Sequence, residues 1–248
     1  MMKKMKKLIR FSVLVLFEIL VINGCKKENN SPSSPYNGKT TAVFNPSVTY
    51  GNMTDQDGNI YKTVTIGTQT WMAENLRTTK YNDGTSIPNV TSSSEWTDLT
   101  TGAYCNYNNT TNTDTIATYG RLFNWYAVNT GKLAPKGWHV PTNADWTTLT
   151  NYLGGQALAG NKLKETDTTH WCSPNSWSTN ETGFTALPGG GLYDYGFDYI
   201  GYVGDWWTAT EITTGYAWRW EIGYNISYVF SNSPPNLRGF SVRCVKDK

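Results

Sequence analysis

The 248-residue chain has only two histidines and four cysteines, and its longest mainly apolar run, Phe11–Ile22, has twelve residues. Histidine and cysteine supply most zinc ligands, and here they do not occur at the spacing of a tetrahedral site. A run of twelve residues is also too short to cross a bilayer as a helix, which needs about 20 residues. The sequence therefore favours neither a zinc protein nor a membrane-spanning anchor.

An excess of charge of one sign is also absent, since charged residues make up 16% of the chain and the formal net charge is +2. Five of the 21 basic residues lie among the first ten residues, at Lys3, Lys4, Lys6, Lys7 and Arg10. Without residues 1–24, 16 basic and 18 acidic residues remain, which leaves a net charge of about −2. A basic patch is the usual electrostatic footprint of nucleic-acid binding, so nucleic acid is not supported as a partner.

The first 24 residues have the pattern of an export signal, because the basic start is followed by the apolar run. The run ends in "VINGC", which resembles the lipobox of bacterial lipoproteins, with Val21 at its first position and Gly24 before Cys25. We predict a lipoprotein signal peptide over residues 1–24 and a lipid on Cys25. Acyl chains would hold the protein at a membrane of the bacterial cell envelope, the outer membrane by our prediction. An ordinary signal peptide followed by a chance cysteine is the alternative.

Residues 25–54 are rich in Asn, Ser, Pro and Thr and show no sustained apolar period. Such a composition buries too little apolar surface to offset the loss of chain entropy on folding. We therefore predict a flexible tether over residues 25–54, in which short extended pieces such as "TAVF" could still dock on the domain. The remaining residues, 55–248, have a length and an apolar content typical of one folded domain.

Two runs typical of strands open this domain, Ile60–Ile66 and Gln69–Ala73, and the tight turn Gly67–Thr68 joins them. Just upstream, "DQDGN" indicates a plain turn. A calcium loop is the alternative interpretation, but an EF-hand loop has its glycine at the sixth position, and Gly58 is at the fourth.

The stretch "KGWHVPTNADWTTL" gives the clearest helix prediction. Thr142 can cap the helix, and Asp145 three residues later can bond back to the cap nitrogen. Apolar residues then recur on one face, at Trp146, Leu149 and Leu153, and two glycines follow. "YGRLFNWYAVNTGK" predicts a second helix, since apolar residues recur there at i, i+3 and i+4. We interpret His139 as a hydrogen-bonded residue at the margin of the core, because no second metal ligand lies near it.

Aromatic residues are abundant, at 14% of the chain, and thirteen of them lie in the 38 residues from Tyr193 to Phe230. We expect short strands and long loops here, which could hardly bury all these rings. Tyrosine and tryptophan among small polar residues are typical of adaptable binding surfaces. We therefore predict an outward-facing ligand-binding platform made of Tyr193, Tyr195, Tyr199, Trp206, Trp207, Trp218, Arg219 and Trp220.

Several phrases together resemble one known family. "DGNIYKTVTIGTQTWMAENL", "YGRLFNWYAV", "APKGWHVPTNADWTTL", "LPGG" and "GFSVRCVKD" are similar to the FISUMP family, the major paralogous domain of Fibrobacter succinogenes. The likeness spans residues 55–247. A looser similarity extends to the sulfatase-modifying, formylglycine-generating proteins. This relation implies an α+β, C-type-lectin-like fold: two helices, a small twisted antiparallel sheet with an N-terminal strand near the C-terminal strand, and long loops.

The departures from these families narrow the expected chemistry. Formylglycine-generating enzymes carry a pair of copper-binding cysteines near the C-terminus, and only Cys244 is present here. The Glu-Pro-Asn, Gln-Pro-Asp and Trp-Asn-Asp motifs of calcium-dependent lectins are absent. The FISUMP resemblance further implies a disulfide between Cys105 and Cys244, with Cys172 unpaired. We predict neither a cofactor nor a metal ion.

Three functions remain open. We favour a non-catalytic binding or adhesion module that recognises a glycan or a surface protein through the aromatic loops. A structural subunit of a surface assembly is the alternative, because it also needs exposed aromatic surface. A polysaccharide hydrolase is the third hypothesis, since glycosidases need two carboxylates and several acids lie among these aromatic residues. The acids of this region are Asp194, Asp198, Asp205 and Glu211.

Overall fold

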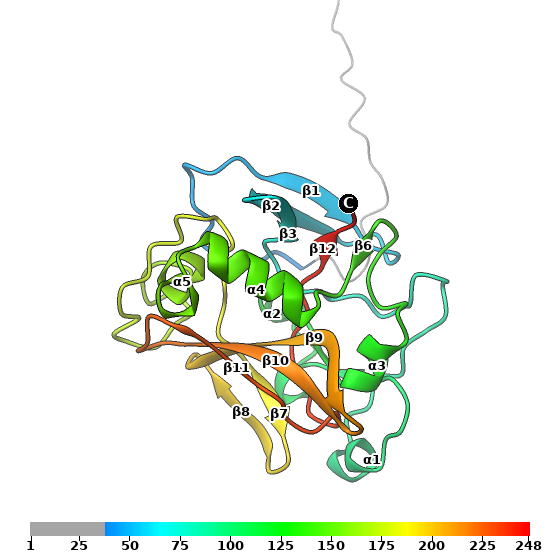
Figure 1. Cartoon of the computed structure of the whole chain (residues 1–248). Helices are drawn as coiled ribbons and strands as arrows, with labels where there is room; N and C mark the ends of the chain where they lie inside the picture. Colours follow the sequence, from blue (N-terminus) through cyan, green and yellow to red (C-terminus); the bar gives the residue numbers. More distant parts are fainter. Residues whose placement is uncertain (1–37) are drawn as a thin grey trace, which may run out of the picture. The chain divides into compact units, whose positions relative to one another are not determined.

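The structure, a computed structural model, describes residues 38–248 (Figure 1). In this range a five-stranded sheet has the order β1-β2-β3-β12-β6. Its strands are β1 (Gly51–Thr54), β2 (Ile60–Ile66), β3 (Gln69–Met72), β12 (Val245–Lys246) and β6 (Trp138–His139), and all neighbours are antiparallel. We call it the first sheet. The first sheet joins the two ends of the described chain, because the C-terminal strand β12 pairs with β3, one of the N-terminal strands.

The second sheet also has five strands, in the order β11-β10-β9-β7-β8. Its strands are β7 (Gly189–Tyr193), β8 (Gly196–Ile200), β9 (Val203–Thr213), β10 (Tyr216–Gly223) and β11 (Val229–Asn232). The β7–β9 pair is parallel and the other pairs are antiparallel. A two-stranded sheet is formed by β4 (Tyr104–Cys105) and β5 (Leu122–Phe123).

The described helices are short. They are α1 (Ser93–Thr97), α2 (Thr113–Tyr119), α3 (Trp125–Asn129), α4 (Asn143–Tyr152), α5 (Gln156–Leu163) and a 3₁₀ turn, η1 (Tyr107–Asn109). α4 lies across the second sheet, between it and the first sheet (Figure 1). The α+β class is confirmed. The expected pair of helices corresponds to α3 and α4, and the other helices were not predicted.

Local signals predicted the best-defined elements. β2 covers the predicted run Ile60–Ile66, and the tight turn before β3 has Gly67 in the left-handed region, at φ 60°. α4 begins with the predicted capping box: the Thr142 side chain accepts from the Asp145 backbone, and the Asp145 carboxylate accepts from the Thr142 N–H. Its apolar face is buried as predicted, at Trp146, Leu149 and Leu153. The second predicted helix is shorter than expected, because Leu122–Phe123 forms strand β5 before α3 begins.

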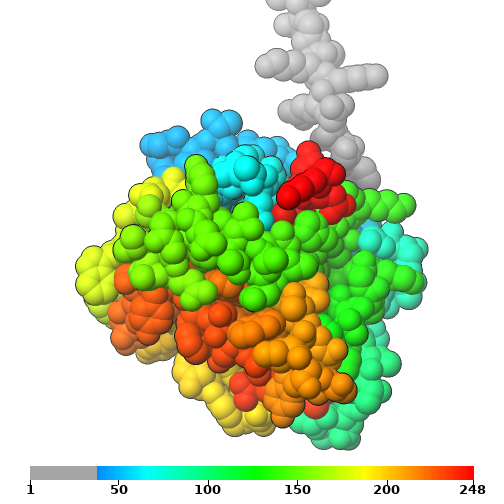
Figure 2. Space-filling view, in the orientation of Figure 1, coloured from blue at the N-terminus to red at the C-terminus, as the bar shows by residue number. Residues whose placement is uncertain are grey.

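The tether prediction is wrong for residues 38–54. β1 pairs with β2 along its whole length. Upstream, the Val43 N–H donates to Glu165, and Phe44, Val48 and Tyr50 pack against the core. Figure 2 shows these blue residues against the body of the domain. A Cβ at Gly38 would overlap the Thr113 carbonyl, so glycine permits this close approach. Residues 25–37 lie outside the described range.

Two large hydrophobic clusters make up most of the core. The first lies around Tyr61, Phe123, Trp125, Trp207 and Phe240. The second contains Trp71, Trp146, Phe184, Trp206 and Trp220. In the second cluster Trp146 stacks on Trp220, with ring centroids 5.5 Å apart and planes 9° apart. The C-terminal segment runs between the clusters, since Phe240 belongs to the first and Val245 to the second.

The disulfide prediction is wrong, because Cys105 and Cys244 are both free and both buried. Cys105 lies on β4 in a small third cluster with Trp96 and Leu192, whereas Cys244 belongs to the first cluster. Each side chain fills space as a small apolar residue. Burial raises the pKa of both thiols far above the ordinary value, so neither is a reactive thiolate. Cys172 is also free, as predicted.

The free thiols give a direct prediction. We expect the protein, unfolded without reductant, to be alkylated at Cys105, Cys172 and Cys244, and reductant to leave the melting temperature unchanged. Peptide mass spectrometry after iodoacetamide treatment checks the first result and calorimetry the second. A disulfide closing so long a loop would add about 4 kcal/mol in the chain-entropy model, so a marked fall in melting temperature with reductant would contradict the structure.

Candidate functional site

The candidate site is a pocket of about 410 Å³ on the second sheet. Side chains from the β7–β8 hairpin, from the start of β9, from β10 and from the segment before the C-terminal strand line it. These residues are Tyr193, Tyr195, Tyr199, Val203, Arg219, Glu221 and Arg238. We call it the tyrosine pocket. Its volume lies in the range of ordinary small-ligand sites.

Three tyrosines form one wall of the pocket. Tyr193 and Tyr195 stack with ring planes 6° apart and centroids 5.6 Å apart, and Tyr199 meets Tyr193 edge to face at 5.3 Å. Tyr193 is buried, whereas Tyr195 is 66% exposed and Tyr199 41% exposed. They lie together because Tyr193 ends β7, Tyr195 is in the tight β7–β8 turn and Tyr199 is near the end of β8. In this wall the buried Tyr193 ring therefore supports the exposed Tyr195 ring that stacks on it.

A second, charged wall is formed by Arg219 and Glu221 of β10. Asp205 and Glu221 are cross-strand partners, and the Arg219 guanidinium bridges them, contacting Asp205 through Nη1 and Glu221 through Nη2 at 2.7 Å. Its Nε donates to Asn232 at 2.8 Å. Arg219 is thus fixed in one orientation by three acceptors. The fixed guanidinium and the half-buried Glu221 carboxylate are the polar groups available to a ligand.

Asp205 contacts both Tyr193 of the tyrosine wall and Arg219 of the charged wall. It is fully buried and accepts a hydrogen bond of 2.6 Å from the Tyr193 hydroxyl. Burial raises the pKa of Asp205 to about 6, against the opposing effect of Arg219. Burial and the neighbouring Asp205 charge raise the pKa of Tyr193, so its hydroxyl remains a donor. Asp205 therefore couples the tyrosine wall to the charged wall.

Arg238 closes the rim. Its Nη2 donates to Asp194 at 2.9 Å, and its guanidinium lies 5.6 Å from the centre of the Tyr193 ring. The Nε of Arg238 has no hydrogen-bond partner within residues 38–248. The rim therefore retains one unused donor beside the aromatic wall.

Four of the eight predicted binding residues line this pocket, namely Tyr193, Tyr195, Tyr199 and Arg219. Three others are wrong, because Trp206, Trp207 and Trp220 are buried in the core. Trp206 and Trp220 are cross-strand partners facing α4, while Trp207 points to the other face and packs against Phe240 at 4.8 Å. The indole N–H groups donate to Asn75, Phe123 and Asn143. The eighth, Trp218, is half-buried and does not line the pocket.

Sequence reasoning missed Val203, Glu221 and Arg238. A signal for Glu221 was available, since "YAWRWEI" reads as a strand and places Glu221 on the same face as Arg219. No comparable signal existed for Arg238, which lies in an irregular segment and reaches the pocket only through tertiary packing.

The acids proposed for hydrolysis are dispersed in their contacts. Asp205 is buried beneath Tyr193 and Arg219, and Asp194 pairs with Arg238. Glu211 accepts from the Gly215 N–H and from Asn236 near the β9–β10 turn. Asp198 accepts from the Tyr199 N–H on β8. The carboxylate that does line the pocket is Glu221, which the hydrolase hypothesis did not include.

The two histidines lie in polar networks outside this pocket. His139 meets Asp247 at 2.8 Å and Asp145 at 3.3 Å, so the predicted hydrogen-bonded position is confirmed. His170 is half-buried and hydrogen-bonds to Glu165 and Thr41. In the turn that begins at Asp55, its carboxylate accepts hydrogen bonds from the Asp57 and Asn59 backbone N–H groups and from the Tyr61 hydroxyl. Among residues 38–248, no group of three or more His, Cys, Asp or Glu side chains is arranged to hold a metal ion.

The fold and pocket define an α+β domain that presents a concave, tyrosine-lined surface on its second sheet. The family model described as the Fibrobacter succinogenes major domain matches residues 64–246, so the chain belongs to that family, as the sequence phrases predicted. No curated protein and no solved structure matches the chain. The C-type-lectin-like relation and the likeness to sulfatase-modifying proteins therefore stay predictions.

Proposed function

We propose that this protein is a non-catalytic binding module of the cell envelope and that it holds a glycan in the tyrosine pocket. The family assignment supports a surface or cell-envelope protein in the broader sense. The observation that carries the finer proposal is the exposed Tyr195 ring, stacked on the buried Tyr193 ring beside the fixed Arg219 and Glu221.

The chemistry of this arrangement suits a sugar. An exposed aromatic face can stack on the apolar face of a pyranose ring, and stacking on a second ring limits the entropy that Tyr195 loses on binding. Arg219 supplies donors and Glu221 supplies acceptors for hydroxyl groups of the same sugar. The aromatic wall and the charged wall face one cavity, so one ligand can use both.

The proposal predicts that Tyr195→Ala weakens glycan binding. We expect a three- to tenfold loss of affinity, about the worth of one stacking contact. The protein should remain folded, because the ring is largely exposed. Glycan arrays identify a ligand for the full chain, and titration calorimetry with that ligand measures the loss. Tyr216→Ala is the matched control, since Tyr216 is also exposed but lies at the β9–β10 turn outside the pocket.

Equal affinity of wild type and Tyr195→Ala for an identified glycan would remove this ring from the site. If the wild type binds no glycan, the glycan proposal fails and a protein ligand is the next hypothesis. Cross-linking in intact cells tests that outcome, because a stoichiometric protein neighbour would indicate a structural subunit of a surface assembly.

We further propose that a lipid on Cys25 tethers the domain to the envelope, at the outer membrane. The "VINGC" motif supports this, and Cys25 lies outside the described residues. Within residues 38–248, no helix is both long enough and apolar enough to cross a membrane. Mass spectrometry of the N-terminal peptide from membrane fractions tests the proposal, which predicts a diacylglyceryl-modified cysteine.

A further inference from the structure

A second pocket, of about 400 Å³, lies between the N-terminal segment and the first sheet. It is distinct from the tyrosine pocket and shares no lining residue with it. Its charged side chains are Lys39 from the N-terminal segment, Lys62 from β2, and Glu74 and Arg77 from the segment after β3. Three cationic groups thus face one carboxylate.

Arg77 is the central feature of this pocket. Its side chain is only 5% exposed, and its guanidinium packs over the Tyr61 ring at 4.4 Å. Nη2 donates to the Ile60 carbonyl at 2.9 Å. Within residues 38–248, Nε and Nη1 have no hydrogen-bond partner. Buried guanidinium donors without acceptors are costly, so this arrangement favours an additional oxygen ligand.

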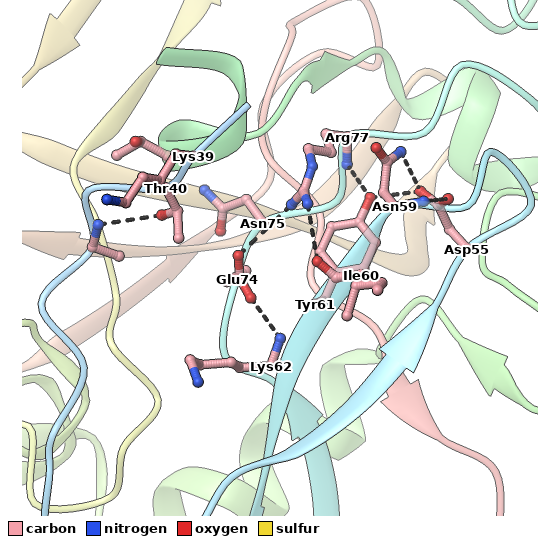
Figure 3. Close-up of polar contacts among 12 residues, drawn as sticks. Lys39, Thr40, Asp55, Asn59, Ile60, Tyr61, Lys62, Glu74, Asn75 and Arg77 are labelled. Carbon is pink, nitrogen blue, oxygen red and sulfur yellow. Dashed lines mark hydrogen bonds and ion pairs between the residues drawn. The ribbon is translucent and has the colours of Figure 1, made fainter. Parts of the chain in front are cut away.

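Glu74 does not satisfy these donors. Its Oε1 lies 3.7 Å from Arg77 Nη1, beyond hydrogen-bond distance, and its Oε2 accepts from the Lys62 backbone N–H. Figure 3 shows the Arg77 guanidinium directed toward Glu74, with the backbone nitrogen of Lys62 on the far side of that carboxylate. One carboxylate offsets only one of the three positive charges in the lining, so the pocket keeps a net positive charge.

The two lysines add available charge at the mouth of the pocket. Neither Lys39 nor Lys62 forms an ion pair within the part of the chain that the structure describes. Lys62 Nζ lies 5.2 Å and 5.3 Å from the centres of the Phe44 and Tyr50 rings. Thr40 and Asn52 complete the polar lining.

We propose that this pocket binds a compact oxyanion, the carboxylate or phosphate group of a ligand, between Arg77 and the two lysines. A guanidinium donor forms a charge-assisted hydrogen bond to an oxygen of either group, and lysine adds point charge. The site combines donors from the N-terminal segment, β2 and the segment after β3. It rests on no feature of the tyrosine pocket.

Titration calorimetry of the full chain with inorganic phosphate, with glucuronate and with neutral glucose tests this site. We expect heat of binding from at least one of the two anions and none from glucose. Lys39→Gln/Lys62→Gln should weaken anion affinity about tenfold or more, the worth of a hydrogen bond to a charged group. Both side chains lie at the pocket mouth, so this variant should fold, and circular dichroism checks that it does.

A matched control separates the pocket from general charge. Lys136→Gln/Lys246→Gln removes the same charge from two exposed lysines that do not line this pocket, and it should leave the affinity unchanged. Binding of phosphate alone, or of glucuronate alone, would support the site and name its source group. Binding of neither anion, or equal weakening in the two double variants, would overturn the proposal. Neither result depends on the outcome for Tyr195.

Discussion

Replacing Lys164 by methionine is expected to lower the free energy of unfolding by about 3 kcal/mol, because the protein loses a buried cation that four backbone carbonyls share. The Lys164 side chain is buried, and its three N–H donors are shared by four backbone carbonyls that lie 3.0–3.2 Å from Nζ: those of Ser176, Gly223, Tyr224 and Ile226. Methionine has a similar volume but no donor, so these carbonyls would lose the partner that they share.

The position of Lys164 explains why the effect should be large. It follows α5 directly and joins this helix to the loop at Ser176 and to the turn between β10 and β11. Burial lowers the pKa of Lys164 to about 8. The amine is therefore protonated at neutral pH, where the measurement should be made.

Urea denaturation at neutral pH measures the change, and Lys162→Met is the control. Lys162 is two residues away on α5, and it pairs with Glu181 at 3.2 Å near the surface. Such an exposed pair contributes about 0–1 kcal/mol, so this variant should be close to the wild type. If Lys164→Met and Lys162→Met lose the same free energy of unfolding, the carbonyls around position 164 do not depend on the Lys164 ammonium group. The bridging role of Lys164 would then be wrong.

The elements found from the sequence are those whose signals are local. The α4 capping box needs only Thr142 and Asp145, three residues apart, and the apolar face of α4 follows the helical period. β2 and β3 are likewise defined by a run of strand-forming residues around a tight turn. These features depend on neighbours in the chain, so one sequence suffices to predict them.

The contacts that sequence reasoning missed join distant segments. The Val43 N–H donates to a carboxylate 122 residues away, and no local pattern reports that contact. Likewise, Cys105 and Cys244 were paired by family resemblance, while the structure places them in different clusters. Composition suggested a tether and the family resemblance suggested a cysteine pair, but the contacts between distant segments contradict both.

Only four of the eight predicted binding residues line the candidate site, for a related reason. Sequence reasoning treated the aromatic residues of the last third as one group, although tyrosines provide the exposed rings of the pocket and the tryptophan pairs fill the core. β9 carries adjacent tryptophans, and adjacent residues of a strand point to opposite faces. Two consecutive buried rings therefore require a strand that is covered on both sides. The covering segments, α4 on one face and Phe240 on the other, are far away in the chain.

Trp206→Ala tests this division between structural and binding rings. Trp206 is fully buried between Trp146 and Phe184, and its indole N–H donates to Asn75 Oδ1, which also accepts from Arg243 Nε. Truncation would leave a cavity in the second cluster and remove a donor from this network. We expect a loss of about 3–5 kcal/mol in the free energy of unfolding, measured by urea denaturation.

Tyr195→Ala is the informative counterpart, because an exposed ring contributes little to stability, within about 0.5 kcal/mol of the wild type. The two substitutions should therefore separate: Trp206→Ala loses stability, and Tyr195→Ala loses ligand affinity with stability retained. Trp206→Phe, which fills part of the cavity, should recover a portion of the lost stability. A Trp206→Ala protein as stable as the wild type but deficient in glycan binding would reverse the assignment and return the tryptophans to the binding surface.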